Sequence, residues 1–164
     1  VYFMARTPTG RIWESRSIDD GKTWADPKPS ALVHPDAPPM VFHLSDDKTL
    51  ITFHHNRHIN TQYVGLTGKM DGMRDRAEIW ISLSKDGGRN WSEPQFLFTN
   101  VTRSNPAKNG WFNHNSSYMD AVIDGGTIHL FLPHLWNRAL YMHLEEKDLA
   151  KLPTIKKLAR RLAK

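Results

Sequence analysis

The chain has 164 residues with 10 glycines, 10 prolines and no cysteine. It is long enough to bury one sizeable core, and the lack of cysteine excludes disulfides, thiolate metal sites and a cysteine nucleophile. Five lysines and arginines in the last nine residues account for the formal charge of +5. A basic tail on a nearly neutral body argues against a nucleic-acid partner. No stretch approaches a membrane span, and the localisation stays unknown, with a secreted or periplasmic protein as one option.

Short apolar runs between turn-rich segments predict strands along most of the chain, because glycine and proline interrupt long helices. Turns at 45–48 and 124–126 join neighbouring runs as hairpins. The period becomes helical only from about Lys147, which predicts an amphipathic helix over 149–162 with its basic residues in solvent. In chain order the strand candidates include residues 12–13, 40–44, 49–54, 79–83, 95–98, 118–123, 127–132 and 139–143.

One internal repeat is clear, in residues 17–24 and 84–91, which share the pattern S-x-D-x-G-x-[TN]-W at a distance of 67 positions. Each copy follows apolar strand residues, so each predicts a strand that enters a tight turn. The aspartate can accept backbone N–H groups, the glycine can adopt a positive φ, and the tryptophan is expected to be largely buried after the turn. These structural positions are Asp19, Gly21, Trp24, Asp86, Gly88 and Trp91.

The repeat resembles the Asp box of bacterial neuraminidases, and the chain as a whole resembles the second half of the exo-sialidases and of the wider Asp-box propeller family. The resemblance implies an all-β fold, part of a six-bladed β-propeller. Residues 1–148 would form about three blades of four-stranded antiparallel sheets, and residues 149–164 a short basic C-terminal helix. The chain starts without methionine inside a strand pattern, so we expect a fragment.

Three further positions match the sialidase pattern. Arg6 and Arg76 resemble the second and third active-site arginines, each of which precedes a strand that leads to an Asp box. Tyr118 resembles the tyrosine nucleophile of a late strand. Arg74 is a rival of Arg76, and Arg138 resembles an arginine that some branches of the family carry late in the chain. For each arginine a rim ion pair, and for Tyr118 a core position, stays an alternative.

The chemistry of these residue types fits a sugar acid. Guanidinium groups bind a carboxylate bidentately and stay charged at every working pH. A phenol is neutral until it reacts, whereas a carboxylate nucleophile would repel the carboxylate of the substrate. Because propeller blades bring their inner strands around one axis, Arg6, Arg76 and Tyr118 are expected to converge.

Other constellations give weaker predictions. His114 and Asn115 are candidates for substrate contact at the mouth of the site. His54, His55 and His58 lack acidic neighbours, so neither a metal nor another cofactor is expected. The family pattern also needs a first arginine, an aspartate acid and a glutamate in earlier blades, and none has a convincing match. We therefore expect an incomplete catalytic set in this chain.

Three hypotheses follow. The first is part of an exo-sialidase that cleaves terminal sialic acid through a tyrosine nucleophile, with a glycan as partner. The second is a non-catalytic or differently catalytic Asp-box propeller that binds or processes another acidic glycan. The third is an interaction scaffold that uses its basic tail and needs no convergence of these residues.

Overall fold

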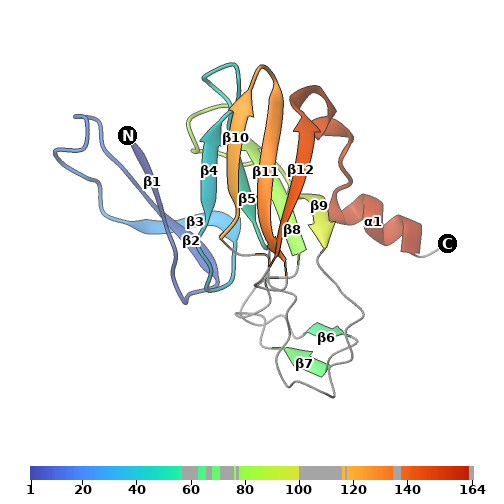
Figure 1. Ribbon diagram of the computed structural model, residues 1–164. Coiled ribbons are helices and arrows are strands. Elements are labelled where there is room, and N and C mark those ends of the chain that lie inside the picture. Colours follow the sequence, from blue (N-terminus) through green and yellow to red (C-terminus); the bar gives the residue numbers. More distant parts are fainter. Residues whose placement is uncertain are drawn as a thin grey trace.

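The computed structural model describes residues 1–56, 63–65, 68–70, 76, 78–99, 116, 118–134 and 138–162. These residues form a mostly β structure with three larger antiparallel sheets (Figure 1). The fold is propeller-like and partial, which confirms the predicted all-β class with a short C-terminal helix.

The three sheets follow one another along the chain. The first consists of β1 (Tyr2–Ala5), β2 (Arg11–Arg16) and β3 (Lys28–Val33). The middle sheet has the order β4 (Met40–His43), β5 (Leu50–His54), β8 (Glu78–Ser84) and β9 (Gln95–Thr99). The third consists of β10 (Asp120–Asp124), β11 (Thr127–His134) and β12 (Arg138–Glu145), and β6 (Tyr63–Gly65) pairs with β7 (Gly68–Met70) in a separate ribbon.

Four strands per sheet were expected, but among the described residues only the middle sheet has four. After β12 the chain turns at Glu146 into a 3₁₀ helix, η2 (Glu146–Lys151), instead of adding a strand to the third sheet. The segment that follows pairs with the middle sheet instead, through a bridge between Gln95 and Thr154. The C-terminal segment thus pairs with the first residues of β9 at the edge of the middle sheet.

The core lies between the middle and third sheets. Alternate residues of each strand point into it, as the two-residue period of a strand requires. The core includes Ile51 and Phe53 of β5, Ile79 and Ile81 of β8, and Ile128, Leu130 and Leu132 of β11. Leu149 of η2 completes the same cluster, so the 3₁₀ helix is held by burial of its own leucine.

The opposite face of the middle sheet carries buried polar side chains and meets the first sheet. Thr52, His54 and Ser82 are all fully buried there. His54 shares hydrogen bonds with the Val33 carbonyl at 3.3 Å and with the Ser82 hydroxyl at 3.1 Å. Burial lowers the pKa of His54 to about 4, so this histidine is neutral in the folded protein.

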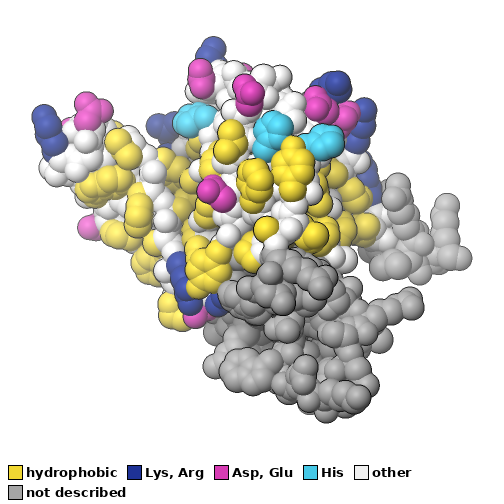
Figure 2. Space-filling model, in the orientation of Figure 1, with side chains coloured by type: hydrophobic (Ala, Val, Ile, Leu, Met, Phe, Trp, Pro, Cys, Tyr) yellow, Lys and Arg dark blue, Asp and Glu magenta, His cyan; other side chains and the backbone are white. Residues whose placement is uncertain are grey.

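The outward face of the third sheet stays exposed and carries apolar and aromatic side chains. Figure 2 shows hydrophobic and histidine side chains gathered over β10–β12. Tyr141 is 56% exposed, stacks on His129 and lies 5.4 Å from Phe131 between ring centroids.

The two Asp boxes form the predicted turns. Asp19 accepts hydrogen bonds from the backbone N–H of Thr23 at 2.8 Å and from its hydroxyl at 2.6 Å. Asp86 does the same with the backbone N–H of Asn90 at 2.9 Å and with its amide at 2.6 Å. These bonds lower the pKa of each carboxyl to about 2, because they stabilise the ionised form. Each aspartate thus accepts a backbone hydrogen bond within its own turn, as expected.

The predicted burial of the two tryptophans is wrong for Trp24 and holds only in part for Trp91. Trp24 is 44% exposed, and its ring packs edge-to-face with the ring of Phe3, which is itself exposed. Its indole N–H donates to the Gly21 carbonyl of its own turn. Trp91 is half-buried beside the ring of Tyr2.

The second Asp box also joins the middle sheet to the first. Gly88 has a φ of +82° and lies against the ring of Tyr2. That ring is fixed, because its hydroxyl donates to Glu14 at 2.8 Å and the Arg16 guanidinium covers its face at 4.3 Å. Arg16 also donates to the carbonyl of Gly87. The box is therefore a junction between sheets as well as a turn.

The C-terminal segment differs from the single helix predicted over 149–162. It forms η2 and then α1 (Ile155–Leu162), with an extended break between them. Pro153 explains the break, because proline lacks the N–H and forces the preceding Leu152 into an extended conformation. The division of the chain at residue 148 stays a prediction.

The apolar stripe of this segment lies on the sheets only in its first part. Leu152 packs on the core and Leu158 is half-buried, whereas Ile155 is 48% exposed. Lys156 and Lys157 face solvent, as predicted. Among the described helices, none is long and apolar enough to cross a membrane.

The junction at Gly88 gives a first prediction. A Cβ at Gly88 would lie 2.9 Å from the Tyr2 ring, whereas a Cβ at Gly126, with a similar φ of +86°, meets nothing within 4 Å. Gly126→Ala should therefore cost only the backbone strain, about 1 kcal/mol, and Gly88→Ala about 3 kcal/mol because overpacking adds to it. Urea unfolding measures both, and equal losses would contradict the fixed contact.

The buried His54 gives a second prediction. Its folded pKa lies near 4, below the ordinary value of 6.5, so the unfolded chain binds the proton first as the pH falls. Its contribution is complete above pH 6.5 and is lost between pH 6.5 and 4, by about 3 kcal/mol. The free energy of unfolding should lose this part of its pH dependence in His54→Gln but keep it in a variant of the exposed His43, His43→Gln. An unchanged slope in His54→Gln would contradict the prediction.

Candidate functional site

The candidate site lies at the end of the sheets opposite the Asp boxes. Arg6 follows β1, and Arg76 and Tyr118 directly precede β8 and β10. Because β8 begins beside Arg76 and ends in the second Asp box, the site and the boxes occupy opposite ends of the sheets (Figure 1). Asp36 reaches the same end from the connection between β3 and β4. We call Arg6, Asp36, Arg76 and Tyr118 the arginine cluster.

Asp36 links the two arginines. Its carboxylate accepts a hydrogen bond from the Nε of Arg6 at 2.6 Å, and its backbone carbonyl accepts one from a terminal amino group of Arg76. The hydrogen bond between Arg6 and Asp36 raises the pKa of Arg6 and lowers the pKa of Asp36. The charge of Arg76 also lowers the pKa of Asp36. An acidic residue thus lies where two guanidinium groups would otherwise repel one another.

Tyr118 joins the cluster through Arg6. Tyr118 is among the groups that contribute to the raised pKa of Arg6. Tyr118 is 55% exposed and has a φ of +64°, a left-handed conformation that is rare for a bulky residue. The backbone around it is anchored, because Met119 is buried and the Ser116 N–H donates to the Arg76 carbonyl at 2.9 Å.

The structure therefore brings Arg6, Arg76 and Tyr118 to one place, with Asp36 between the arginines. This arrangement offers two cations, one acid and one exposed phenol at a common surface. It can bind an anion and present a hydroxyl beside it. The roles of the three predicted residues in binding and catalysis stay predictions.

A buried pair of histidines supports the loop of Asp36. His34 and His55 stack with ring centroids 5.3 Å apart. The backbone N–H of His55 donates to Nδ1 of His34, so the proton of a neutral His34 is on Nε2, which donates to the Ala37 carbonyl at 2.8 Å. Burial, with the charges of the neighbouring histidines, lowers the pKa of His34 well below its ordinary range. Nδ1 of His55 also lies 2.8 Å from the Glu78 carbonyl.

The other predicted residues lie apart from the arginine cluster or outside the described residues. Arg138 opens β12, and its side chain lies outside the described residues, as do His114, Asn115, Arg74 and His58. His54 and His55 have separate partners, Ser82 and Glu78. In the described ranges, no three His, Asp or Glu side chains are placed to hold a metal ion.

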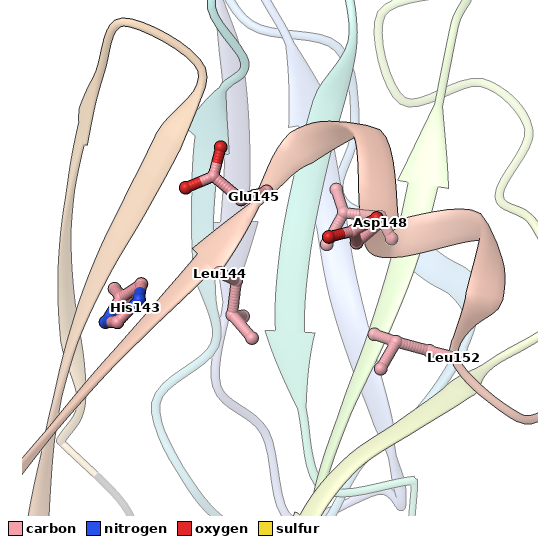
Figure 3. Close-up of a pocket in the computed structure, with 6 residues that line it drawn as sticks. His143, Leu144, Glu145, Asp148 and Leu152 are labelled. Atoms are coloured by element: carbon pink, nitrogen blue, oxygen red, sulfur yellow. The ribbon is translucent and has the colours of Figure 1, made fainter.

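A separate pocket of about 240 Å³ lies between β12 and η2 (Figure 3). Its lining includes the acidic residues Glu145 and Asp148 beside Leu149 and Leu152. It lies at the end of β12 away from Arg138 and shares no residue with the arginine cluster. Two carboxylates in its wall make it a poor site for a sugar acid.

The sequence patterns did not identify Asp36. The feature that could have indicated it is its position among prolines between two strands, in the run His34-Pro35-Asp36-Ala37-Pro38-Pro39. Prolines on both sides restrict the backbone and predict a rigid turn, where an acidic side chain has a fixed direction.

The chain matches the family model of the BNR repeat-like domain over residues 1–130, a range that includes both Asp boxes and the whole arginine cluster. No curated protein matches the chain. Because the match spans well over half of the 164 residues, the chain belongs to the family of BNR repeat-like domains.

Proposed function

We propose that this chain forms part of a glycoside hydrolase of the exo-sialidase type, and that the arginine cluster belongs to its sugar-acid site. The observation that carries the proposal is the meeting of Arg6 and Arg76 at Asp36, beside the exposed Tyr118. The Asp boxes support the family and the fold but not the activity, because their aspartates are engaged within their own turns.

In this proposal the arginines bind the carboxylate of a terminal sialic acid. With both guanidinium groups charged and Asp36 ionised, the three residues carry a net charge of +1 (two cations and one anion). The pair therefore attracts a further anion even though Asp36 is present. Planar guanidinium groups add geometric selectivity, because they pair with a carboxylate through parallel hydrogen bonds.

Tyr118 is the proposed nucleophile. Its phenol oxygen would attack the anomeric carbon and pass its proton to a general base, while the glycosidic C–O bond breaks and the leaving oxygen takes a proton from a general acid; water then hydrolyses the tyrosyl intermediate. The phenol suits this place because, unlike a carboxylate, it does not repel the sugar acid before it reacts. Its left-handed φ of +64° is the kind of strain that collects at functional sites.

A binding protein for another acidic glycan is the second candidate. One observation favours it: Asp36 is the one acid of the arginine cluster, and it is engaged with Arg6. The cluster by itself therefore contains no general acid. A binding protein needs the arginines but not the tyrosine nucleophile, so the two candidates differ in what Tyr118 does.

The role of Tyr118 can be tested in the full-length protein. Tyr118→Phe should abolish the turnover of an aryl sialoside, with kcat lowered about 10³-fold or more, because the attacking oxygen is gone. Tyr141→Phe is a matched control, since Tyr141 is an equally exposed tyrosine of the third sheet. A wild-type enzyme that Tyr118→Phe leaves fully active would contradict the nucleophile and favour the binding protein.

The role of Arg76 can be tested by binding. Arg76→Lys keeps the charge but loses the planar pair of donors, so the Kd for N-acetylneuraminate should rise about tenfold while the protein stays folded. Arg89→Lys, at an exposed position of the second Asp box, should leave the Kd unchanged. Isothermal titration calorimetry compares the variants, and equal Kd values for the wild type and Arg76→Lys would count against the carboxylate site.

A further inference from the structure

Asp36 contacts the two arginines through two different groups. Its carboxylate holds Arg6 and its backbone carbonyl holds Arg76. The separation of the two guanidinium groups is therefore set by the geometry of a single residue. Neither sequence pattern that singled out the arginines includes this residue.

The backbone of Asp36 is fixed even though its side chain is 41% exposed. The Ala37 N–H donates to the Pro35 carbonyl at 2.7 Å, which closes a three-residue γ-turn with Asp36 at its centre. Pro35 and Ala37 on either side are buried. The buried His34 donates to the Ala37 carbonyl, and its own backbone N–H donates to Gly10 at 3.1 Å. A turn held on both sides projects its central side chain in one direction.

Arg6 donates its hydrogen bond to Asp36 through Nε–H. A guanidinium has five N–H donors in one plane, and a partner at Nε fixes that plane while terminal N–H groups stay open to further partners. Bidentate pairing with a ligand carboxylate requires such a fixed plane. Arg6 is also 41% exposed, so without Asp36 its long side chain would be free to sample several rotamers.

We propose that Asp36 is a positioning residue that orients Arg6, and spaces it from Arg76, for the carboxylate of an acidic sugar. The proposal rests on the proposed function for its ligand, but the effect of Asp36 on Arg6 can be measured without one. Asp36 acts through the arginines and does not itself contact the sugar acid. Its carboxylate therefore increases the affinity for a sugar acid, although it is itself an anion.

The first experiment observes Arg6 directly. In arginine side-chain ¹⁵N NMR spectra, the Nε–H signal of Arg6, assigned with Arg6→Lys, should be protected from exchange with water in the wild type. In Asp36→Asn its exchange should be at least about tenfold faster. The control is Asp26→Asn, which makes the same charge change at an exposed position near the first Asp box. An Arg6 signal that does not change in Asp36→Asn would overturn the proposal.

The second experiment measures binding of N-acetylneuraminate and of its methyl ester, which lacks the charge. Asp36→Asn should weaken binding of the acid about tenfold and leave the ester unchanged. Tighter binding of the acid would show that Asp36 competes with the ligand and would overturn the proposal. A wild type that binds neither compound contradicts the proposed function alone, and the NMR comparison then decides on Asp36.

Should Asp36→Asn fail to fold, Asp36→Glu provides the same comparison, since it keeps the charge but displaces the carboxylate by one methylene. A changed Arg6 signal with weaker binding of the acid supports positioning. A wild-type signal together with wild-type affinity would overturn it, because the position of the carboxylate would then not matter.

Discussion

Two guanidinium groups that share one small surface need an anion between them, and in this chain Asp36 is that anion. Its carboxylate and carbonyl engage Arg6 and Arg76 at once. An exposed ion pair of this kind contributes little stability by itself. The elements around it therefore have to fix its geometry. The γ-turn at Asp36 and the buried, neutral His34 fix this geometry through hydrogen bonds.

The middle sheet carries a junction with the first sheet at one end and residues of the arginine cluster at the other. At one end β8 runs into the second Asp box, where Gly88 rests on Tyr2 and joins two sheets. At the other end the same strand begins beside Arg76, and β10 begins beside Tyr118. The core of Ile51, Phe53 and the leucines of β11 lies between these ends. Because cores are close-packed and deform little, a junction at one end helps to hold the register at the other.

The sequence predicts the local features well and the contacts between distant segments less well. The turn chemistry of Asp19 and Asp86 is local, so four neighbouring residues suffice to predict it. The burial of Trp24 depends on what stands beside its turn, which no local pattern contains, and that prediction is wrong. The prediction of a single helix over 149–162 is wrong because it followed the apolar period and did not take account of Pro153. Asp36 was missed because its importance comes from Arg6 and Arg76, 30 and 40 positions away.

The groups of the site and the groups beneath it respond differently to acid. The arginines stay charged at all working pH values, and Arg6 keeps Asp36 ionised by lowering its pKa. His34 and His54 are buried as neutral rings, and their pKa values are lowered because burial disfavours the charged form. Protonation of His34 would place a hydrogen on Nδ1, where the His55 N–H already donates. Protonation of His34 would therefore break a hydrogen bond that supports the loop of Asp36, so it would act on the arginine cluster through this loop and not through the charges of the cluster itself.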